Sequence, residues 1–309
     1  MRALLVVNPQ ATSTTPAGRD VLTHALASEL KLDVLQTRYR GHAAEAVAAA
    51  AREGVELVIA HGGDGTVNEV VNGILEAFPD GPGPEVPALA VLPGGSANVF
   101  ARAIGVPRDP MEATASVLAA LEAGRSRMVG LGRADDRWFT FNAGMGWDAD
   151  VVADVERARA KGLEASPGRY ARTALRHYLR QYRRPTTLTV ELPGREPVDG
   201  VRLMLVCNTD PWTYLGSRPV RTNPGCGRTD GLALFALLHL GPTTIVPVLR
   251  EMLRKEGNPD GPKILRDDEL PLIRVSSSTP VALQVDGDYL GERSEMEFIA
   301  VPSALRVVV

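Results

Sequence analysis

The chain has 309 residues, of which 44% are hydrophobic and 23% are charged, and its formal net charge is −3. This near-neutral balance argues against nucleic acid as the principal partner, and no segment holds the roughly 20 apolar residues of a membrane-spanning helix. The length predicts two domains, since one domain usually takes about 150 residues.

The first 130 residues alternate between apolar runs and amphipathic segments. A continuous apolar run predicts a strand buried on both faces at 3–8, and further strands are predicted at 32–37, 55–60 and 88–92. Helical spacing of apolar residues predicts helices at 17–30, 42–53, 66 onward, 97–104 and 111–124. Strict alternation of strand and helix predicts an α/β domain over residues 1–130, with a Rossmann-like parallel sheet and helices on both faces.

This alternation stops after Gly124. Strand-like runs separated by Pro, Gly or Asp follow at 138–144, 186–192, 200–208, 231–238, 271–277, 281–287, 296–301 and 305–309. Only 166–184 and 242–256 have helical spacing between them. Residues 131–302 are therefore predicted to form an all-β domain, an antiparallel β-sandwich or an open barrel.

Polar loops follow three of the predicted parallel strands, at 8–15, 61–66 and 93–98, and the last two are rich in glycine. Ligands of such sheets bind at the carboxyl ends of the strands, where these loops meet. Thr66 and Glu69 match a capping box that predicts a helix start at Thr66, and Ser96 is the predicted N-cap of the next helix, which ends before Gly105. The amides of both glycine turns are predicted to hold a di- or triphosphate.

Asp64 lies inside the loop Gly62–Thr66 and would repel a phosphate. A role in phosphoryl transfer, holding water, metal or an acceptor hydroxyl, accounts for a carboxylate there. The alternative is a tight strand-to-helix turn that binds nothing, and the glycines alone leave it open.

The chain has two cysteines, Cys207 and Cys226, without metal-ligand spacing, which predicts reduced thiols. The N-terminal apolar run reaches a polar turn at Asn8, too early for a signal peptide. Both features predict a cytoplasmic protein.

Four segments occur in a recognisable order: VVNPQA (6–11), HGGDGTVNEVVNG (61–73), LPGGSANVFAR (92–102) and FNAGMGWDADVV (141–152). Together they resemble the diacylglycerol kinase catalytic-domain family of lipid kinases, which includes bacterial diacylglycerol kinases and sphingosine and ceramide kinases. The resemblance extends over essentially the whole chain. GGDGT alone is less specific, because NAD kinases and phosphofructokinases share it.

The resemblance implies that ATP and a lipid meet in a cleft between the two domains, and that residues 303–309 complete the first domain. Together with the glycine loops it assigns the nucleotide contacts to Asn8, Pro9, Thr37, Gly62, Gly63, Asp64, Gly65, Thr66, Asn68, Glu69, Gly95 and Ser96. It implies a structural Mg²⁺ held by Asp230 and the backbone oxygens of Gly227 and Leu232. A plain type I turn capped by Asp-Gly is the alternative for that segment.

The chain departs from the family pattern at two positions. Val99 occupies a position where the family often has an aspartate of its magnesium network. Asp288 aligns with the catalytic glutamate, and we assign it the role of base beside Asp64. Glu292 is a second candidate outside the motif, and an Asp-Gly hairpin turn is the structural alternative for residues 285–291.

Residues 157–184 carry nine Lys or Arg and one acidic residue. The helical part has tyrosines on one face and Arg172, Arg176 and Arg180 on the other, which is typical of a helix lying on an anionic membrane. A solvated face packed on the second domain is the alternative.

These observations predict an ATP-dependent lipid kinase, cytoplasmic and peripherally membrane-associated, with diacylglycerol as the acceptor and sphingoid or ceramide-like lipids next. A soluble-metabolite kinase of the NAD kinase type is one alternative. A family member that binds nucleotide or lipid with little turnover is another, because of Val99 and Asp288. The sequence does not decide between a monomer and a homodimer.

Overall fold

The computed structural model describes residues 1–11, 15–79, 83, 85–160, 172–173, 176, 188–227 and 231–309. The chain divides into two compact units. The first joins Met1–Leu131 to Pro302–Val309, and the second is Gly132–Val301. Each unit carries some of the residues that the sequence assigns to the active site.

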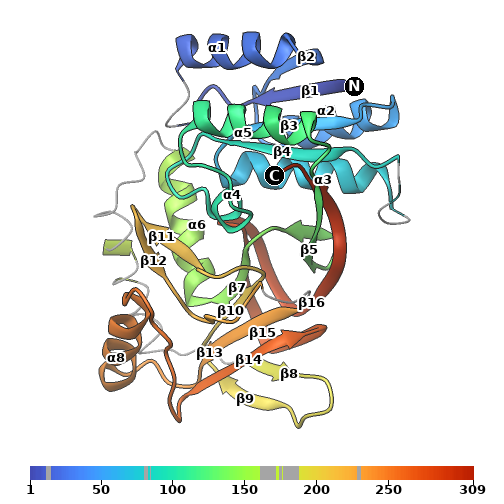
Figure 1. The fold of residues 1–309 in the computed structure, drawn as a ribbon. Coiled ribbons are helices and arrows are strands. Elements are labelled where there is room, and N and C mark those ends of the chain that lie inside the picture. Colours follow the sequence, from blue (N-terminus) through green and yellow to red (C-terminus); the bar gives the residue numbers. More distant parts are fainter. Residues whose placement is uncertain are drawn as a thin grey trace. The chain divides into compact units, whose positions relative to one another are not determined.

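The first unit is built on a parallel β-sheet with the strand order β2, β1, β3, β4 (Figure 1). Its strands are β1 (Arg2–Val7), β2 (Lys31–Gln36), β3 (Leu57–Gly62) and β4 (Ala88–Pro93). From β1 the chain proceeds first to one side, to β2, and then to the other, to β3. The sheet therefore has a topological switch point between β1 and β3, the place where open α/β sheets bind their ligands.

Helices cover both faces of this sheet (Figure 1). α1 packs against α5, and α2 packs against α3. Because strand–helix–strand crossovers are right-handed, the reversal of direction at β1 sends the first helix to one face and the next two to the other. The helices are α1 (Pro16–Ala27), α2 (His42–Arg52), α3 (Asp64–Ala77), α4 (Val99–Ala103) and α5 (Pro110–Glu122). The predicted α/β fold is confirmed.

The end of the chain extends this sheet. In the last part of β16 (Asp288–Val307), Val307 pairs in parallel with Leu89 of β4, and the amide of Val308 donates to the Leu89 carbonyl at 2.9 Å. Leu305, Val307 and Val308 are buried. The tail thus adds a strand beside β4 and contributes apolar side chains to the first unit.

The second unit is a large antiparallel sheet. Its strands follow the order β14, β13, β10, β7, β15, while β8 pairs with the first part of β15 and with β9. The strands outside the first sheet are β5 (Arg127–Ala134), β6 (Arg137–Phe139), β7 (Asn142–Gly146), β8 (Leu188–Glu191), β9 (Val198–Val201), β10 (Leu203–Cys207), β11 (Thr213–Leu215), β12 (Arg218–Val220), β13 (Leu232–Leu237), β14 (Ile264–Leu270) and β15 (Leu272–Val285). The predicted antiparallel all-β region is confirmed.

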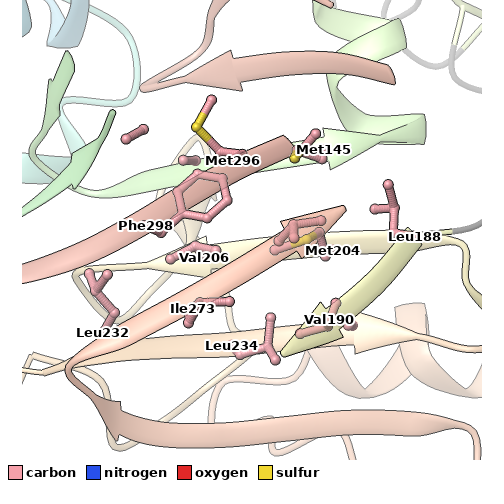
Figure 2. Packing of buried hydrophobic residues seen from close by; sticks show 14 of the residues in the cluster. Met145, Leu188, Val190, Met204, Val206, Leu232, Leu234, Ile273, Met296 and Phe298 are labelled. Carbon is pink, nitrogen blue, oxygen red and sulfur yellow. The ribbon is translucent and has the colours of Figure 1, made fainter. Parts of the chain in front are cut away.

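Alternate side chains of these strands fill two cores, because successive residues of a strand point to opposite faces. Met204 and Val206 of β10 lie in one cluster with Phe298 and Ile273 (Figure 2). The neighbouring residues of β10 lie in a second cluster that includes Ile245 of α8 (Pro242–Met252). Burial on both faces explains why β10 and β13 are uninterrupted apolar runs.

One helix of the second unit was not predicted from the sequence. α6 (Trp147–Ala160) follows β7 directly and packs against β15, β7 and β10. Val151, Val152 and Val155 are buried at helical spacing. This short apolar pattern is the sequence feature from which α6 could have been predicted. By contrast, α8 confirms the helix predicted at 242–256.

The basic helix predicted at 166–184 lies almost wholly outside the described residues. Arg172, Thr173 and Arg176 are described and are helical, and both arginines are exposed. Arg180 lies outside the described residues. Within the described part of the chain, no helix is both long and apolar enough to cross a membrane.

Candidate active site

The first glycine turn connects β3 to α3 at the switch point of the sheet. Its last glycine before the helix, Gly63, is the N-cap of α3 and makes no side-chain hydrogen bond to the first helical turn. The turn lies beside the end of β1, since the amide of Asn8 donates to the His61 carbonyl at 3.0 Å and Asn8 Nδ2 donates to Thr66 Oγ1 at 3.2 Å. A helix N-terminus without a side-chain cap is suited to an anion such as phosphate.

The second glycine turn packs directly on the first, backbone against backbone. A Cβ atom on Gly95 would lie 2.7 Å from the Cα of Gly63, and one on Gly94 would lie 3.0 Å from the Cα of Gly62. No side chain fits between these four residues. The two turns therefore lie against each other, and this packing requires glycine in both.

The amides of the second turn are used within the protein. Gly94 N donates to the Gly62 carbonyl at 2.7 Å, and Gly95 N donates to Asn98 Oδ1 at 2.9 Å. Asn98 Nδ2 returns a bond to the Gly95 carbonyl at 2.6 Å. The prediction that Gly94 and Gly95 direct their amides at phosphate is wrong, because these amides hold the two turns together.

Two predicted helix caps differ from the structure. Ser96 does not cap the helix after the second turn, because α4 begins at Val99 with Asn98 as its N-cap, in the left-handed region at φ 47°. The side chain of Asn98 forms two hydrogen bonds with the backbone of Gly95, and the helix begins only after Asn98. Gly105 follows the C-cap of α4 at φ +86°, as predicted.

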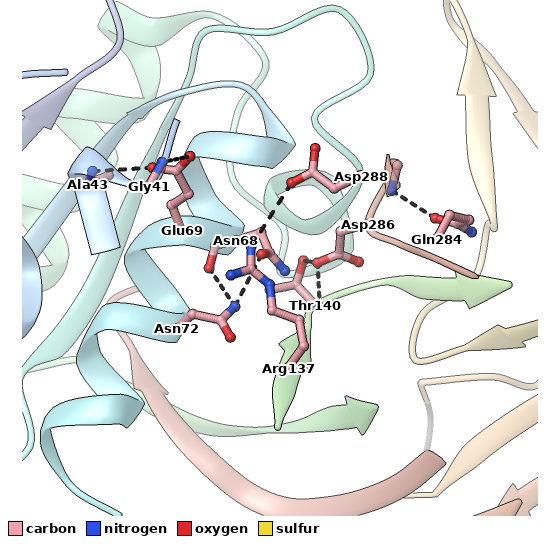
Figure 3. A network of polar contacts seen from close by, with 11 residues as sticks. Gly41, Ala43, Asn68, Glu69, Asn72, Arg137, Thr140, Gln284, Asp286 and Asp288 are labelled. Carbon is pink, nitrogen blue, oxygen red and sulfur yellow. Dashed lines mark hydrogen bonds and ion pairs between the residues drawn. The ribbon is translucent and has the colours of Figure 1, made fainter. Parts of the chain in front are cut away.

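The predicted capping box of α3 is also wrong. α3 begins at Asp64, not at Thr66. The two oxygens of Glu69 accept from the amides of Gly41 at 2.9 Å and Ala43 at 3.2 Å, at the start of α2 (Figure 3). Since the N-cap Gly41 has no side chain, Glu69 of α3 supplies the cap of α2.

Other predicted nucleotide contacts lie around the same sheet edge or below it. Pro9 follows β1, and Thr37 follows β2 with its amide bonded to the Val7 carbonyl at 2.9 Å. Asn68 is fully buried on α3, where Asn72 Nδ2 donates to its side-chain oxygen at 3.1 Å (Figure 3). Asn68 is thus part of a buried polar pair beneath the turn, and Asn72 is the member that sequence reasoning missed.

Asp64 has a structural partner inside the first unit. Its Oδ1 accepts from the amide of Phe100 at 3.3 Å, in the first turn of α4. The carboxylate thus stabilises the positive end of that helix. His61, just before the turn, is buried with Nδ1 3.2 Å from the Leu92 carbonyl, and burial lowers its pKa. His61 is therefore a buried hydrogen-bonding residue.

In the second unit, Asp288 follows a two-residue hairpin turn between β15 and β16. Val285 pairs with Asp288, and the two residues between them have positive φ, 48° at Asp286 and 81° at Gly287. This is the Asp-Gly pattern of a type I′ turn. The structural alternative for this segment is therefore correct, and it is compatible with a catalytic role, because the turn ends at Asp288.

Asp286 locks this turn to the segment before β7. Its Oδ2 accepts from the amide and the hydroxyl of Thr140 at 2.7 and 2.8 Å (Figure 3). Its Oδ1 accepts from the amides of Phe141 and Asn142 at 3.0 Å each. Burial raises the pKa of Asp286, and these four donors oppose that effect. A carboxylate with four donors in fixed geometry holds the backbone of the turn in one place.

Asp288 itself is partly exposed. Its Oδ2 lies 4.0 Å from Arg137 Nη2, a loose ion pair within the second unit (Figure 3). Arg137 was not predicted, because only the pairing of distant strands brings it near Asp288. Glu292 is exposed on β16, opposite Ala282, and is not part of the turn.

Asp148, in the first turn of α6, is a buried carboxylate that the sequence did not single out. Burial raises its pKa to about 6, and the hydrogen bond from Gln284 opposes this effect. In the unfolded chain the same group titrates near 3.8. Between these values the folded protein binds a proton that the unfolded chain does not, so stability falls as pH rises from about 4 to about 6.

The variant Asp148→Asn removes this titration. Its free energy of unfolding is expected to rise relative to that of the wild type by about 2 to 3 kcal/mol between pH 4 and pH 7. Urea unfolding of both proteins at several pH values measures this difference. A difference that stays constant with pH, or that changes in the opposite direction, would contradict the assignment.

The predicted magnesium turn is described only in part. Gly227 is exposed at φ +79°, and Leu232 is buried at the start of β13, while Asp230 lies outside the described residues. Among the residues that are described, no group of three or more His, Cys, Asp or Glu side chains is placed to hold a metal. The metal site remains a prediction, because it depends on Asp230.

Comparisons with known proteins point to a kinase. Residues 2–133 match the family model of the diacylglycerol kinase catalytic domain. The diacylglycerol kinase of Bacillus subtilis strain 168 is 28% identical over 305 residues, covering 94% of this chain and 90% of the relative. Residues 2–133 thus form a diacylglycerol kinase catalytic domain, and the chain is a lipid kinase. A Pseudomonas putida strain KT2440 protein named "Probable lipid kinase YegS-like" is 29% identical over 276 residues, covering 89% of this chain and 84% of the relative.

A solved structure has a similar fold. The crystal structure of a diacylglycerol kinase from Bacillus anthracis strain Sterne has a TM-score of 0.72 at 20% identity and covers 99% of this chain and 96% of the other. Val99, where the resemblance implies an aspartate, begins α4 and is 1% exposed. This position therefore lies in the apolar core.

Proposed function

We propose that this lipid kinase transfers the γ-phosphate of ATP to a lipid hydroxyl, and that diacylglycerol is the acceptor. The observation that supports it most is the glycine turn ahead of α3, at the switch point of the sheet and beside Asn8. The match to the catalytic-domain model supports the kinase activity, and the name of the Bacillus subtilis relative supports the acceptor. Sphingoid and ceramide-like lipids are the next candidates.

In this proposal the first unit binds the nucleotide. The amides at the start of α3 hold the phosphates. Because Gly63 has no side chain, the phosphates can approach its backbone closely. Asn8, Thr37 and Thr66 border the same edge of the sheet. Asp64 accepts from the amide of Phe100 and so fixes the start of α4. Its negative charge would also help to hold a cation beside the γ-phosphate.

Asp288 is the base of the transfer. Its carboxylate accepts the proton of the lipid hydroxyl as the hydroxyl oxygen bonds to the γ-phosphorus. The bond between that phosphorus and the β–γ bridging oxygen breaks, and ADP leaves with the electron pair. The proton on Asp288 then passes to solvent, which restores the carboxylate.

Magnesium belongs to this proposal as a structural ion. Asp230 and the backbone oxygens of Gly227 and Leu232 would hold it, and a cation there would neutralise carboxylate charge and order the turn before β13.

An acceptor panel tests the proposal. The purified chain with ATP and magnesium is incubated with diacylglycerol, sphingosine, ceramide or NAD, and transfer of the labelled γ-phosphate is measured. We expect the highest kcat/KM with diacylglycerol. Transfer to NAD alone would establish a soluble-metabolite kinase, and no transfer to any acceptor would establish a binding protein.

The lipid substrate also implies a membrane surface as partner. Arg172 and Arg176 are exposed, and together with Arg180 they are proposed to contact anionic lipids. Each cation near such a surface contributes about 1 kcal/mol, so changing all three to Glu is expected to weaken binding at least about tenfold. Co-sedimentation with phosphatidylserine-containing vesicles measures this.

A matched control changes three exposed arginines elsewhere to Glu, which alters the net charge equally. These are Arg108, Arg125 and Arg218. Equal loss of vesicle binding in both triple variants would show a general charge effect and would contradict the proposed surface.

A further inference from the structure

Gln284 of β15 connects the turn that carries Asp288 to two other buried polar groups. Its Oε1 accepts from the amide of Gly287 at 2.9 Å (Figure 3). Its Nε2 donates to Asn142 Oδ1 at 2.9 Å and to Asp148 Oδ2 at 3.0 Å. Gln284 is 1% exposed. Both hydrogens of its amide nitrogen and its amide oxygen are therefore engaged, which fixes the orientation of the side chain.

The neighbouring strand provides the space for this arrangement. Gly144 of β7 pairs with Gln284. A Cβ atom at Gly144 would lie 3.1 Å from Asp148 Oδ2 and 3.1 Å from Gln284 Nε2. An alanine there would press on both partners of one hydrogen bond, so glycine at this position is explained by the bond and not by a turn.

The turn is thus held from two sides. Asp286 binds the segment from Thr140 to Asn142, and Gln284 binds the amide of Gly287, the residue directly before Asp288. Asp148 anchors Gln284 from a helix, and a hydrogen bond to a charged group is stronger than one between neutral groups. A fully satisfied buried network of this kind is rigid, and rigid support is what keeps a catalytic group within reach of its substrate.

We propose that Gln284 is a positioning residue for Asp288 and that Asp148 is its anchor. This inference rests on the proposed function, in which Asp288 is the base. Gln284 touches no substrate and acts through the backbone at Gly287. Its removal therefore affects the transfer step and leaves ATP binding unchanged, because the nucleotide residues belong to the first unit.

The main test is the variant Gln284→Met, which keeps the side-chain volume and removes the hydrogen bonds. We expect kcat to fall about 10- to 100-fold, as for a small displacement of a catalytic group, with the KM for ATP within about twofold of wild type. The decisive measurement is the double variant with Asp288→Asn. If Gln284 acts only through Asp288, the double variant has the same kcat as Asp288→Asn alone.

Two further variants separate positioning from loss of folding. Asp148→Asn keeps an oxygen that accepts from Gln284, so its kcat should stay within about threefold of wild type. Gly144→Ala should lower kcat in the same way as Gln284→Met, and it serves as the test if the latter does not fold. Thr222→Val, a buried polar substitution outside this network, controls for a general loss of stability.

The outcomes distinguish the inference from the proposed function. Wild-type kcat in Asp288→Asn would overturn the role of the base itself. Loss of activity in Asp288→Asn together with wild-type kcat in both Gln284→Met and Gly144→Ala would overturn only the role of Gln284. Additive losses in the double variant would also overturn it, since they would show an effect that does not pass through Asp288.

Discussion

Replacing Asp288 by Asn is expected to lower kcat for lipid phosphorylation by about 10²- to 10⁴-fold, the range that a general base contributes. Asn keeps the shape of the side chain but cannot accept the hydroxyl proton. The turn that precedes it is held by Asp286 and Gln284, so the fold should persist. Initial rates at saturating ATP and lipid, with a thermal unfolding curve for each protein, measure the effect.

Two companion variants assign the role to this position. Asp288→Glu restores the family's residue and a carboxylate, and its kcat should stay within about tenfold of wild type. Glu292→Gln should leave the rate unchanged, because Glu292 lies outside the turn. If Glu292→Gln abolished transfer while Asp288→Asn retained it, the base would be Glu292.

The second large effect is expected for Gly95→Ala. The new Cβ would lie 2.7 Å from the Cα of Gly63, and neither backbone is a flexible side-chain end that can move aside. Overpacking of this kind costs about 1 to 3 kcal/mol of stability. Because the displaced atoms belong to the turn proposed to hold the phosphates, binding of a non-hydrolysable ATP analogue should weaken about tenfold or more. Urea unfolding and calorimetric titration measure the two effects.

Gly65→Ala is the matched control in the same loop. A Cβ on Gly65 meets nothing within 4 Å, and the residue lies in the first turn of α3. Alanine in place of glycine in a helix should therefore raise stability by up to about 1 kcal/mol. If Gly95→Ala were as stable as Gly65→Ala, the close packing of the two glycine turns would not matter in solution.

Periodicity was sufficient for the fold because burial acts on every residue of an element. The run 3–8 and the spacing of 42–53 have one physical explanation each, a strand buried on both faces and a helix packed on one. β1 and α2 were found for this reason. α6 was missed because its apolar signal, Val151 to Val155, covers little more than one turn.

Site residues could be predicted from the sequence only where their hydrogen-bond partners are close to them in the chain. Asp286 and Gly287 adopt the turn that their types favour. Glu69 matches a capping box by spacing, yet it caps a different helix, since its partners Gly41 and Ala43 are distant in sequence. Gln284 resembles an ordinary strand residue until the pairing of β15 with β7 is known. Hydrogen bonds between residues that are distant in the sequence cannot be predicted from the spacing of residue types.

The path of β16 determines when the first unit is complete during synthesis. Its sheet needs Val307 beside Leu89, and the ribosome makes these residues more than two hundred positions apart. Until the last residues emerge, β4 has an unpaired edge, which is a template for wrong pairing. The amino-terminal half alone lacks this strand, so a shortened form meant to bind nucleotide is best designed to keep residues 302–309.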